Sequence, residues 1–120
     1  MNAKILICDD EQEILDITRL ILEDEGFDVT SVLDSLSVEK LIEREKPDIL
    51  LIDLWMPGIS GDQIVRNLRR NVLLSDLPVV VISASRDGKE IALACGADDF
   101  LEKPYDINAL IDTVSKHLVR

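Results

Sequence analysis

The sequence predicts an α/β fold with a five-stranded parallel sheet in the order 2-1-3-4-5 and helices on both faces. Apolar strand-like runs alternate with helical patterns five times along the 120 residues, which is typical of βα units. Three of the runs are continuously apolar, as expected for strands covered on both faces. Right-handed crossovers leave few topologies for such units, and this order places the first and third strands side by side.

The expected strands divide into central and edge strands. The first, third and fourth, at residues 5–8, 49–52 and 79–82, read as buried central strands. The second, at residues 27–32, alternates apolar and polar side chains, which favours a sheet edge. The fifth, at residues 99–103, is short and mixed in polarity, and it is also expected at an edge.

The first and third helices carry start signals. Asp10 with Glu13 reads as a capping box at the start of the first helix, which Gly26 is expected to end. Ser60 with Gln63 reads as the same motif at the start of the third helix. The residues expected to face inward are Ile14, Ile17 and Ile21 in the first helix and Ile64, Val65, Leu68 and Val72 in the third.

The fifth helix has the clearest 3.6-residue period. Its expected inner residues are Ile107, Leu110, Ile111, Val114 and Leu118. The second and fourth helices, at about residues 37–44 and 88–95, have weaker patterns. The chain is therefore expected to form one domain over residues 1–120, a flavodoxin-like (βα)5 three-layer sandwich.

The composition excludes several classes of function. A formal net charge of −11 and the lack of a basic stripe argue against direct binding of nucleic acid. The longest apolar run is far short of the roughly 20 residues that span a membrane, and no signal peptide precedes the first strand, so a cytoplasmic protein is expected. Cys8 and Cys95 form neither a zinc pattern nor a C-x-x-C pair and are expected to be buried, reduced thiols.

Reactive polar residues follow the apolar runs at the carboxyl ends of the expected strands. They are Asp9, Asp10, Asp53, Ser83 and Lys103. In an open parallel sheet these ends line the crevice where ligands bind, so the side chains are expected to converge. Carboxylates held so close disfavour joint ionisation without a cation, which indicates a Mg²⁺ and phosphate site centred on Asp53.

The expected cation ligands are all oxygen atoms. Asp10 and Asp53 are expected to bind Mg²⁺ directly and Asp9 through a water molecule, with the backbone carbonyl of Trp55 as a further ligand. Mn²⁺ is expected to substitute for Mg²⁺. Simpler readings of the single residues remain, because Asp10 alone would suit a helix cap and a lone Asp at a strand end suits an ordinary loop.

Ser83 and Lys103 complete the expected site. The Ser83 hydroxyl is placed to donate a hydrogen bond to a bound oxyanion, and Lys103 supplies a mobile point charge suited to phosphate. A cis peptide bond before Pro104 would aim the lysine inward. The simpler reading of Lys103 is a structural ion pair with the aspartates.

Taken together and in this order, the motifs resemble those of a bacterial two-component response-regulator receiver domain of the chemotaxis, or CheY-like, type. The motifs are Asp9-Asp10, Asp53-Leu54-Trp55-Met56-Pro57-Gly58, Ser83-Ala84, Gly96-Ala97-Asp98-Asp99-Phe100 and Lys103-Pro104. The resemblance covers residues 4 to about 119. Any one motif is weak, whereas the ordered set is specific.

The resemblance implies a phosphoryl switch. Asp53 would accept a phosphoryl group from a phosphohistidine on a sensor histidine kinase, with Mg²⁺ neutralising the transferred group. Ser83 and Lys103 would each bind one phosphoryl oxygen. Phe100 would then follow Ser83 inward and reshape the face made by the fourth helix, the fifth strand and the fifth helix. The alternative for Phe100 is an ordinary core residue of an edge strand.

The resemblance also implies two residues that set the lifetime of the signal. Trp55 and Ser85 would tune the attack of water on the phosphoryl group, and the bulky Trp55 would slow self-dephosphorylation. The alternative is a surface-packed tryptophan without a kinetic role. His117 suits favourable placement at a helix C-terminus better than phosphotransfer.

Three other functions fit the residues less well than the switch does. A Mg²⁺-dependent phosphatase or phosphotransferase with an Asp nucleophile usually has a second Asp two positions on, where this chain has Trp55. A flavin-binding module would need a phosphate loop after the first strand, where Asp9, Asp10 and Glu11 would repel phosphate. A degenerate receiver that acts only as an interaction surface is disfavoured because the key groups are all present.

We therefore expect a phosphorylation-controlled switch rather than an enzyme, with self-phosphorylation and self-dephosphorylation as its only reactions. The expected partners are a sensor histidine kinase or phosphotransfer protein and a downstream protein or effector domain. No contact with nucleic acid or membrane is expected. The chain is expected to be a monomer or a phosphorylation-dependent homodimer.

Overall fold

Five parallel strands form one sheet in the order β2-β1-β3-β4-β5, which confirms the predicted order and both predicted edges. The strands are β1 (Lys4–Cys8), β2 (Asp28–Val32), β3 (Ile49–Asp53), β4 (Val79–Ser83) and β5 (Asp99–Glu102). This computed structural model describes residues 2–118. Met1, Val119 and Arg120, at the ends of the expected domain, lie outside the described residues.

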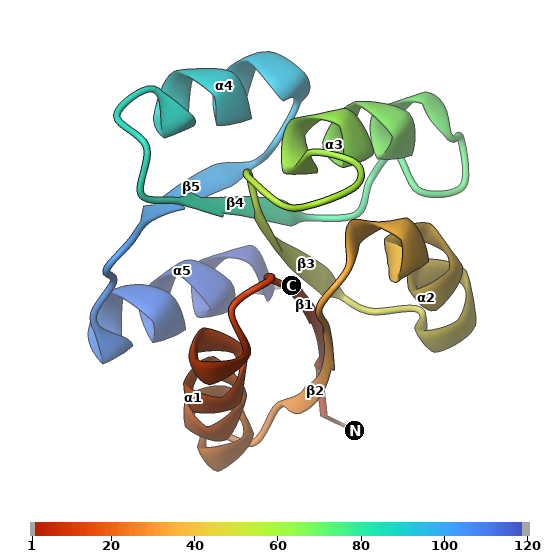
Figure 1. Cartoon of the computed structure of the whole chain (residues 1–120). Coiled ribbons are helices and arrows are strands. Elements are labelled where there is room, and N and C mark those ends of the chain that lie inside the picture. The colour runs from red at the N-terminus through yellow and green to blue at the C-terminus, as the bar shows by residue number, and fades with distance from the viewer. Residues whose placement is uncertain (1, 119–120) are drawn as a thin grey trace.

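Within residues 2–118, five α-helices cover the sheet on its two faces. They are α1 (Gln12–Asp24), α2 (Val38–Glu45), α3 (Gly61–Arg70), α4 (Gly88–Cys95) and α5 (Ile107–Leu118), and a short 3₁₀ helix (Ser35–Ser37) precedes α2. Figure 1 shows α1 and α5 together on one face and α2, α3 and α4 on the other. The fold is therefore the three-layer sandwich that the alternating pattern predicts.

Two apolar cores hold these layers together. β3 and β4 are buried along their whole length, because their Val, Ile and Leu side chains enter a core on either face. One core packs the sheet against α1 and α5, with Leu15, Leu22, Leu110 and Val114 from the helices. The other packs it against α2, α3 and α4, with Val38, Ile42, Ile64, Leu68 and Ala92. Central strands fixed in this way give a rigid support to the residues that follow them.

The first helix differs from the prediction in its start and in its buried face. Within residues 2–118, Glu11 is the N-cap of α1 and makes no side-chain capping bond, so the predicted capping box of Asp10 and Glu13 is wrong. The buried residues of α1 are Leu15, Thr18 and Leu22, whereas Ile17 is 59% exposed. The buried face is thus shifted by about one residue from the predicted face, although Ile21 is partly buried and packs against the same core. Gly26, with φ of +96°, follows the helix end as expected.

Two further expectations about helices are corrected. Ser60 is the N-cap of α3 but, among the described residues, its side chain caps no backbone N–H, so the capping box with Gln63 is also wrong. Val72 is 87% exposed because α3 ends at Arg70, two residues before it. Ile107 is exposed because it is the first residue of α5, where the chain has only begun to turn over the sheet.

The structure tests the expectation that the two cysteines are buried thiols and shows whether any helix could span a membrane. Cys8 and Cys95 are buried free thiols, as predicted. Burial raises the pKa of Cys8 to about 12, with Asp34 and the neighbouring aspartates adding to the shift, so this thiol is held in its neutral form. No helix within residues 2–118 is long and apolar enough to cross a membrane.

Candidate functional site

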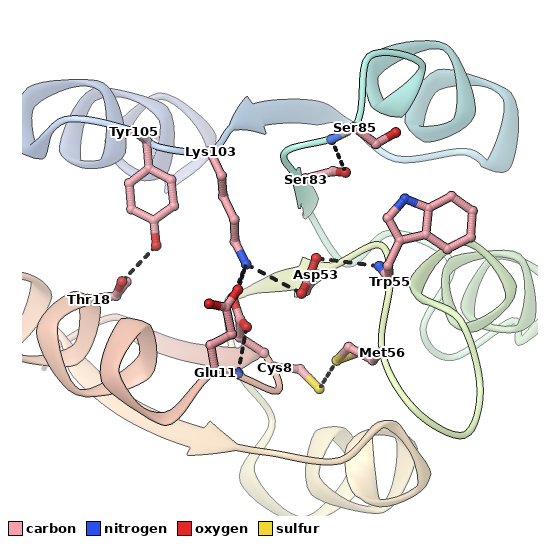
Figure 2. Close-up of polar contacts among 11 residues, drawn as sticks. Cys8, Glu11, Thr18, Asp53, Trp55, Met56, Ser83, Ser85, Lys103 and Tyr105 are labelled. Atoms are coloured by element: carbon pink, nitrogen blue, oxygen red, sulfur yellow. Dashed lines mark hydrogen bonds and ion pairs between the residues drawn. The ribbon is translucent and has the colours of Figure 1, made fainter.

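The carboxyl edge of the sheet brings the predicted residues together. In the strand register Cys8 pairs with Ile52, so Asp9 leaves β1 beside Asp53 at the end of β3. Ser83 ends β4 next to β3, and Lys103 directly follows β5. Figure 2 shows the Lys103 amine pointing toward Asp53. An open depression of about 520 Å³ lies here, lined by Asp10, Glu11, Asp53, Trp55, Ser83, Ala84, Ser85 and Lys103.

Four carboxylates cluster at this edge. Asp9, Asp10, Glu11 and Asp53 each offer an oxygen atom, and these atoms all lie within 4.8 Å of one another. Asp9 and Asp53 are 1% and 6% exposed, whereas Asp10 and Glu11 are exposed. Burial raises the pKa of Asp53 from 3.8 to about 6; the charge of Lys103 opposes this shift and that of Asp9 adds to it. Burial is therefore the main reason why the Asp53 carboxyl holds a proton more readily than an ordinary aspartate, and the nearby charges partly offset one another.

Lys103 is the cation that faces this cluster. Its Nζ atom lies 2.7 Å from Asp9 Oδ2, 3.2 Å from Glu11 Oε1 and 3.4 Å from Asp53 Oδ2. Burial alone would lower the pKa of Lys103, but the bonds to Asp9, Asp53 and Glu11 together raise it above its ordinary value. The Lys103–Pro104 peptide bond is cis. The ammonium group is thus charged and contacts three of the four carboxylates, those of Asp9, Glu11 and Asp53.

The donor set fits a hard divalent cation. Carboxylate oxygens are the ligands that Mg²⁺ takes, and two of the four carboxylates are exposed to the open depression. Asp9 Oδ2 is buried and has no well-aligned hydrogen bond within residues 2–118, although Lys103 lies 2.7 Å away. This oxygen keeps acceptor capacity that a hydrated cation could use.

Ser83, at the end of β4, also lines the depression. It is buried, and its Oγ accepts a hydrogen bond of 3.0 Å from the backbone N–H of Ser85. The Ser85 hydroxyl in turn donates to the Asp87 carboxylate. Because an oxygen that accepts this bond still has its own proton to donate, Ser83 can also serve an oxyanion in the depression.

Phe100, in β5, is half-buried and lies near Ser83. A Cβ atom added at Gly88 would lie 2.9 Å from Phe100 Cε1 and 3.0 Å from Ser83 Cβ. The phenyl ring and the serine therefore flank the same point at the start of α4, and a larger residue at position 88 would crowd both. This places the expected switch aromatic against the expected switch hydroxyl.

Trp55 stands at the rim of the depression. Its indole is 54% exposed, and its backbone N–H donates to Asp53 Oδ1 over 3.4 Å. Figure 2 shows the Trp55 and Met56 side chains pointing in different directions, with Met56 directed toward Cys8. The Met56 sulfur lies 3.4 Å from Cys8 Sγ. The two residues after Leu54 thus separate, one over the site and one into the core.

Sequence reasoning missed several residues that shape the site. Glu11 joins both the carboxylate cluster and the Lys103 pairing, and the acidic run after the first strand was the available signal. The hydroxyl groups of Thr18 on α1 and Tyr105, two residues after Lys103, lie 2.7 Å apart. They are 87 positions apart in sequence, so no local pattern could reveal this link.

Comparisons with known proteins agree with this geometry. A family model described as "Response regulator receiver domain" matches residues 5–115. A Chloroflexus aurantiacus protein described as a response regulator has a structure with a TM-score of 0.95; it is 26% identical and is matched over 100% of both chains. The receiver domain of Francisella response regulator 1452 is 32% identical, with a TM-score of 0.88 and coverage of 97% of this chain and 96% of that one. Chemotaxis response regulator CheY4 of Vibrio cholerae, 24% identical with a TM-score of 0.91, shares the fold over 98% of this chain and 100% of its own.

Proposed function

Because the chain belongs to the response regulator receiver domain family, we propose that Asp53 is its phosphoacceptor in a two-component phosphorelay. Receiver domains are regulatory switches, and the whole of residues 1–120 is proposed to form one such domain. The observation that carries the proposal is the position of Asp53. It is a nearly buried carboxylate at the end of a central strand, with Lys103 Nζ 3.4 Å from one oxygen.

The reaction needs little covalent chemistry from the protein. A carboxylate oxygen of Asp53 forms a bond to phosphorus, and the bond from phosphorus to the nitrogen of a donor phosphohistidine breaks, with its electron pair returning to the imidazole. Catalysis then depends on position and charge. Asp53 is nearly buried at the end of β3, and the open depression beside it would leave room for the donor.

The carboxylate cluster would hold Mg²⁺, or Mn²⁺ in its place. Asp10, Asp53 and the carbonyl of Trp55 would bind the cation directly, and Asp9 would bind it through a water molecule. When bound, the cation neutralises negative charge on the transferring phosphoryl group.

Lys103 and Ser83 would bind the product. The Lys103 amine already lies within reach of Asp53, so it needs only to exchange a carboxylate partner for a phosphoryl oxygen. The Ser83 hydroxyl would turn its proton toward a second phosphoryl oxygen and weaken its bond from Ser85. Trp55 and Ser85 flank the phosphoryl position and would set how readily water attacks it.

Phosphorylation would be read at the surface made by α4, β5 and α5. Movement of Ser83 would free space for the Phe100 ring, which packs beside it at the start of α4. The proposed partners are a sensor histidine kinase or phosphotransfer protein, and a downstream protein or effector domain. The switch would work in the cytoplasm as a monomer or a phosphorylation-dependent homodimer, with self-phosphorylation and self-dephosphorylation as its only reactions.

Intact-protein mass spectrometry tests the proposal. Wild-type protein incubated with acetyl phosphate and Mg²⁺ should gain one phosphate, and Asp53→Asn should gain none. Asp76→Asn, which alters an exposed aspartate outside the depression, is the matched control and should behave as wild type. Incorporation should be lost in EDTA. Equal incorporation in Asp53→Asn would refute the assignment of the phosphoacceptor.

A further inference from the structure

The loop that connects β3 to α3, residues 54–60, is held at its crest, residues 57–59, by a serine that precedes α2. Ser35, in the 3₁₀ helix before α2, is 2% exposed and lies against residues 57–59 of this loop. Its hydroxyl donates to the Pro57 carbonyl over 3.0 Å and accepts from the Ile59 backbone N–H over 2.8 Å. One buried hydroxyl therefore satisfies two backbone groups of the same loop.

The close fit at Gly58 shows how tightly this contact is made. Gly58 lies between the two bonded residues, with φ of +90°. A Cβ atom at this position would lie 3.0 Å from Ser35 Oγ, which is tighter than ordinary packing. The base of the loop is closed separately by a 2.9 Å hydrogen bond from Gly61 N–H to the Leu54 carbonyl. The loop is thus fixed at two points, one at its base and one at its crest.

Trp55 lies between these two points. Its backbone leaves the Leu54 end of the loop directly over Asp53, to which its N–H donates. The chain before Trp55 is fixed at Leu54, and the chain after it is fixed by the hydrogen bonds of Ser35 to Pro57 and Ile59. The direction of the Trp55 carbonyl therefore depends on both contacts. A carbonyl so constrained costs little entropy to order when a cation binds it.

We propose that Ser35 is a positioning residue that holds the loop of residues 54–60 in the shape that presents the Trp55 carbonyl to a divalent cation. This inference rests on the proposed function, because it assigns Ser35 a role toward the cation site of Asp10 and Asp53. Ser35 does not touch the cation. It acts through the loop, as residues behind metal ligands do when they fix the orientation of those ligands.

A hydroxyl is the chemical group that this position requires. Alanine would leave the Pro57 carbonyl and the Ile59 N–H without their partner in a buried place, so the loop crest would shift or admit water. Threonine keeps both the donor and the acceptor. Ser37 provides a matched control, because it lies on the same turn but its hydroxyl bonds to Asp34 rather than to the loop.

A Mg²⁺ titration of the unphosphorylated protein, followed by Trp55 fluorescence and by calorimetry, tests the inference. We expect Ser35→Ala to bind Mg²⁺ about tenfold more weakly than wild type, and Ser37→Ala and Ser35→Thr to bind within about twofold of it. Unchanged affinity in a folded Ser35→Ala variant would overturn the inference and leave the proposed function standing. Absence of Mg²⁺ binding by wild type would overturn both.

A second measurement needs no variant and covers the case in which Ser35→Ala fails to fold. In wild-type protein without cation, the Ile59 amide should exchange its hydrogen slowly, because the buried Ser35 hydroxyl accepts it. Exchange as fast as that of an exposed loop amide would show that the crest is not held and would overturn the inference. A thermal midpoint measured in EDTA separates loss of the fold from loss of cation affinity.

Discussion

Replacing Lys103 with methionine tests how the carboxylate cluster is stabilised in the absence of a cation. Methionine keeps most of the length and volume of the side chain but removes its charge. Asp9 and Asp53, which are both buried, would then face each other with no positive partner at 2.7 or 3.4 Å. Because a carboxylate buried without a partner is costly, the folded state should lose stability.

The size of the effect follows from the surroundings of the ion pairs. Removing one member of a fully buried pair costs about 3–5 kcal/mol. Here Asp10 and Glu11 are exposed, so water reaches one side of the cluster and we expect a smaller loss of about 2–3 kcal/mol. For a domain of this size, that loss lowers the thermal midpoint by roughly 8–12 °C.

Thermal unfolding at pH 7.5, in EDTA and in Mg²⁺, measures this loss. Lys103→Met should unfold well below wild type in EDTA and recover part of the difference in Mg²⁺, because the cation replaces the missing positive charge. Lys116→Met is the matched control, since Lys116 is exposed and pairs with Asp99 over 3.4 Å, so its loss should have little effect. If Lys103→Met and Lys116→Met unfold at the same temperature in EDTA, Lys103 does not stabilise the cluster and the reasoning fails.

Three further predictions concern Trp55, the contact between Gly88 and Phe100, and Asp99. Trp55→Asn should release phosphate several-fold faster than wild type in a release assay, because it uncovers the phosphoryl position; equal or slower release would contradict a screening role. Gly88→Ala places a methyl group 2.9 Å from Phe100 Cε1, so it should shift the ring signals in NMR spectra and cost about 1–3 kcal/mol in urea unfolding; unchanged ring signals would contradict the contact. Burial tends to raise the pKa of Asp99, but hydrogen bonds from His117, from its neighbour's backbone and from a lysine outweigh this and lower the pKa below 3.8. A carboxyl with a lowered pKa stabilises the folded state above its unfolded pKa and loses this effect as the pH falls through the folded value. The difference between the urea midpoints of wild type and Asp99→Asn should therefore be present at pH 5 and should shrink as the pH falls below 3.8; a gap that stays open in acid would count against the lowered pKa.

The sheet and the meeting of its strand ends could be predicted from the sequence because both depend on short-range patterns. Continuous apolar runs identify central strands, and the residue after such a run must lie at the carboxyl edge. Asp53 and Asp9 are buried at that edge for this reason. Once the strand order is fixed, Lys103 has to arrive at the same edge from β5.

The buried faces of the helices were harder to predict because two overlapping faces compete in an apolar helix. In α1, the sets beginning at Ile14 and at Leu15 both follow the helical period, and only contact with the sheet selects the second. The capping boxes failed for a related reason. Asp10 and Ser60 have side-chain oxygen atoms that could cap a helix. Sequence spacing, however, does not show whether these atoms reach a backbone N–H.

Long-range polar contacts were beyond prediction from one sequence. Ser35 and Ile59 are 24 positions apart, and nothing in the sequence around Ser35 distinguishes it from an ordinary turn serine. The space that Gly88 leaves for the Phe100 ring likewise appears only after α4 and β5 are packed. Such contacts depend on how loops from different βα units pack together. The spacing of apolar residues along the sequence carries no information about this packing.

Chemical location of the phosphoryl group tests the central claim most directly. Protein phosphorylated with acetyl phosphate and Mg²⁺ is treated with borohydride, which reduces an aspartyl phosphate to homoserine, and its peptides are then sequenced by mass spectrometry. The account predicts homoserine at position 53 and at no other aspartate. Reduction at Asp9 or Asp10 with position 53 unmodified, or phosphate found on His117, would contradict it.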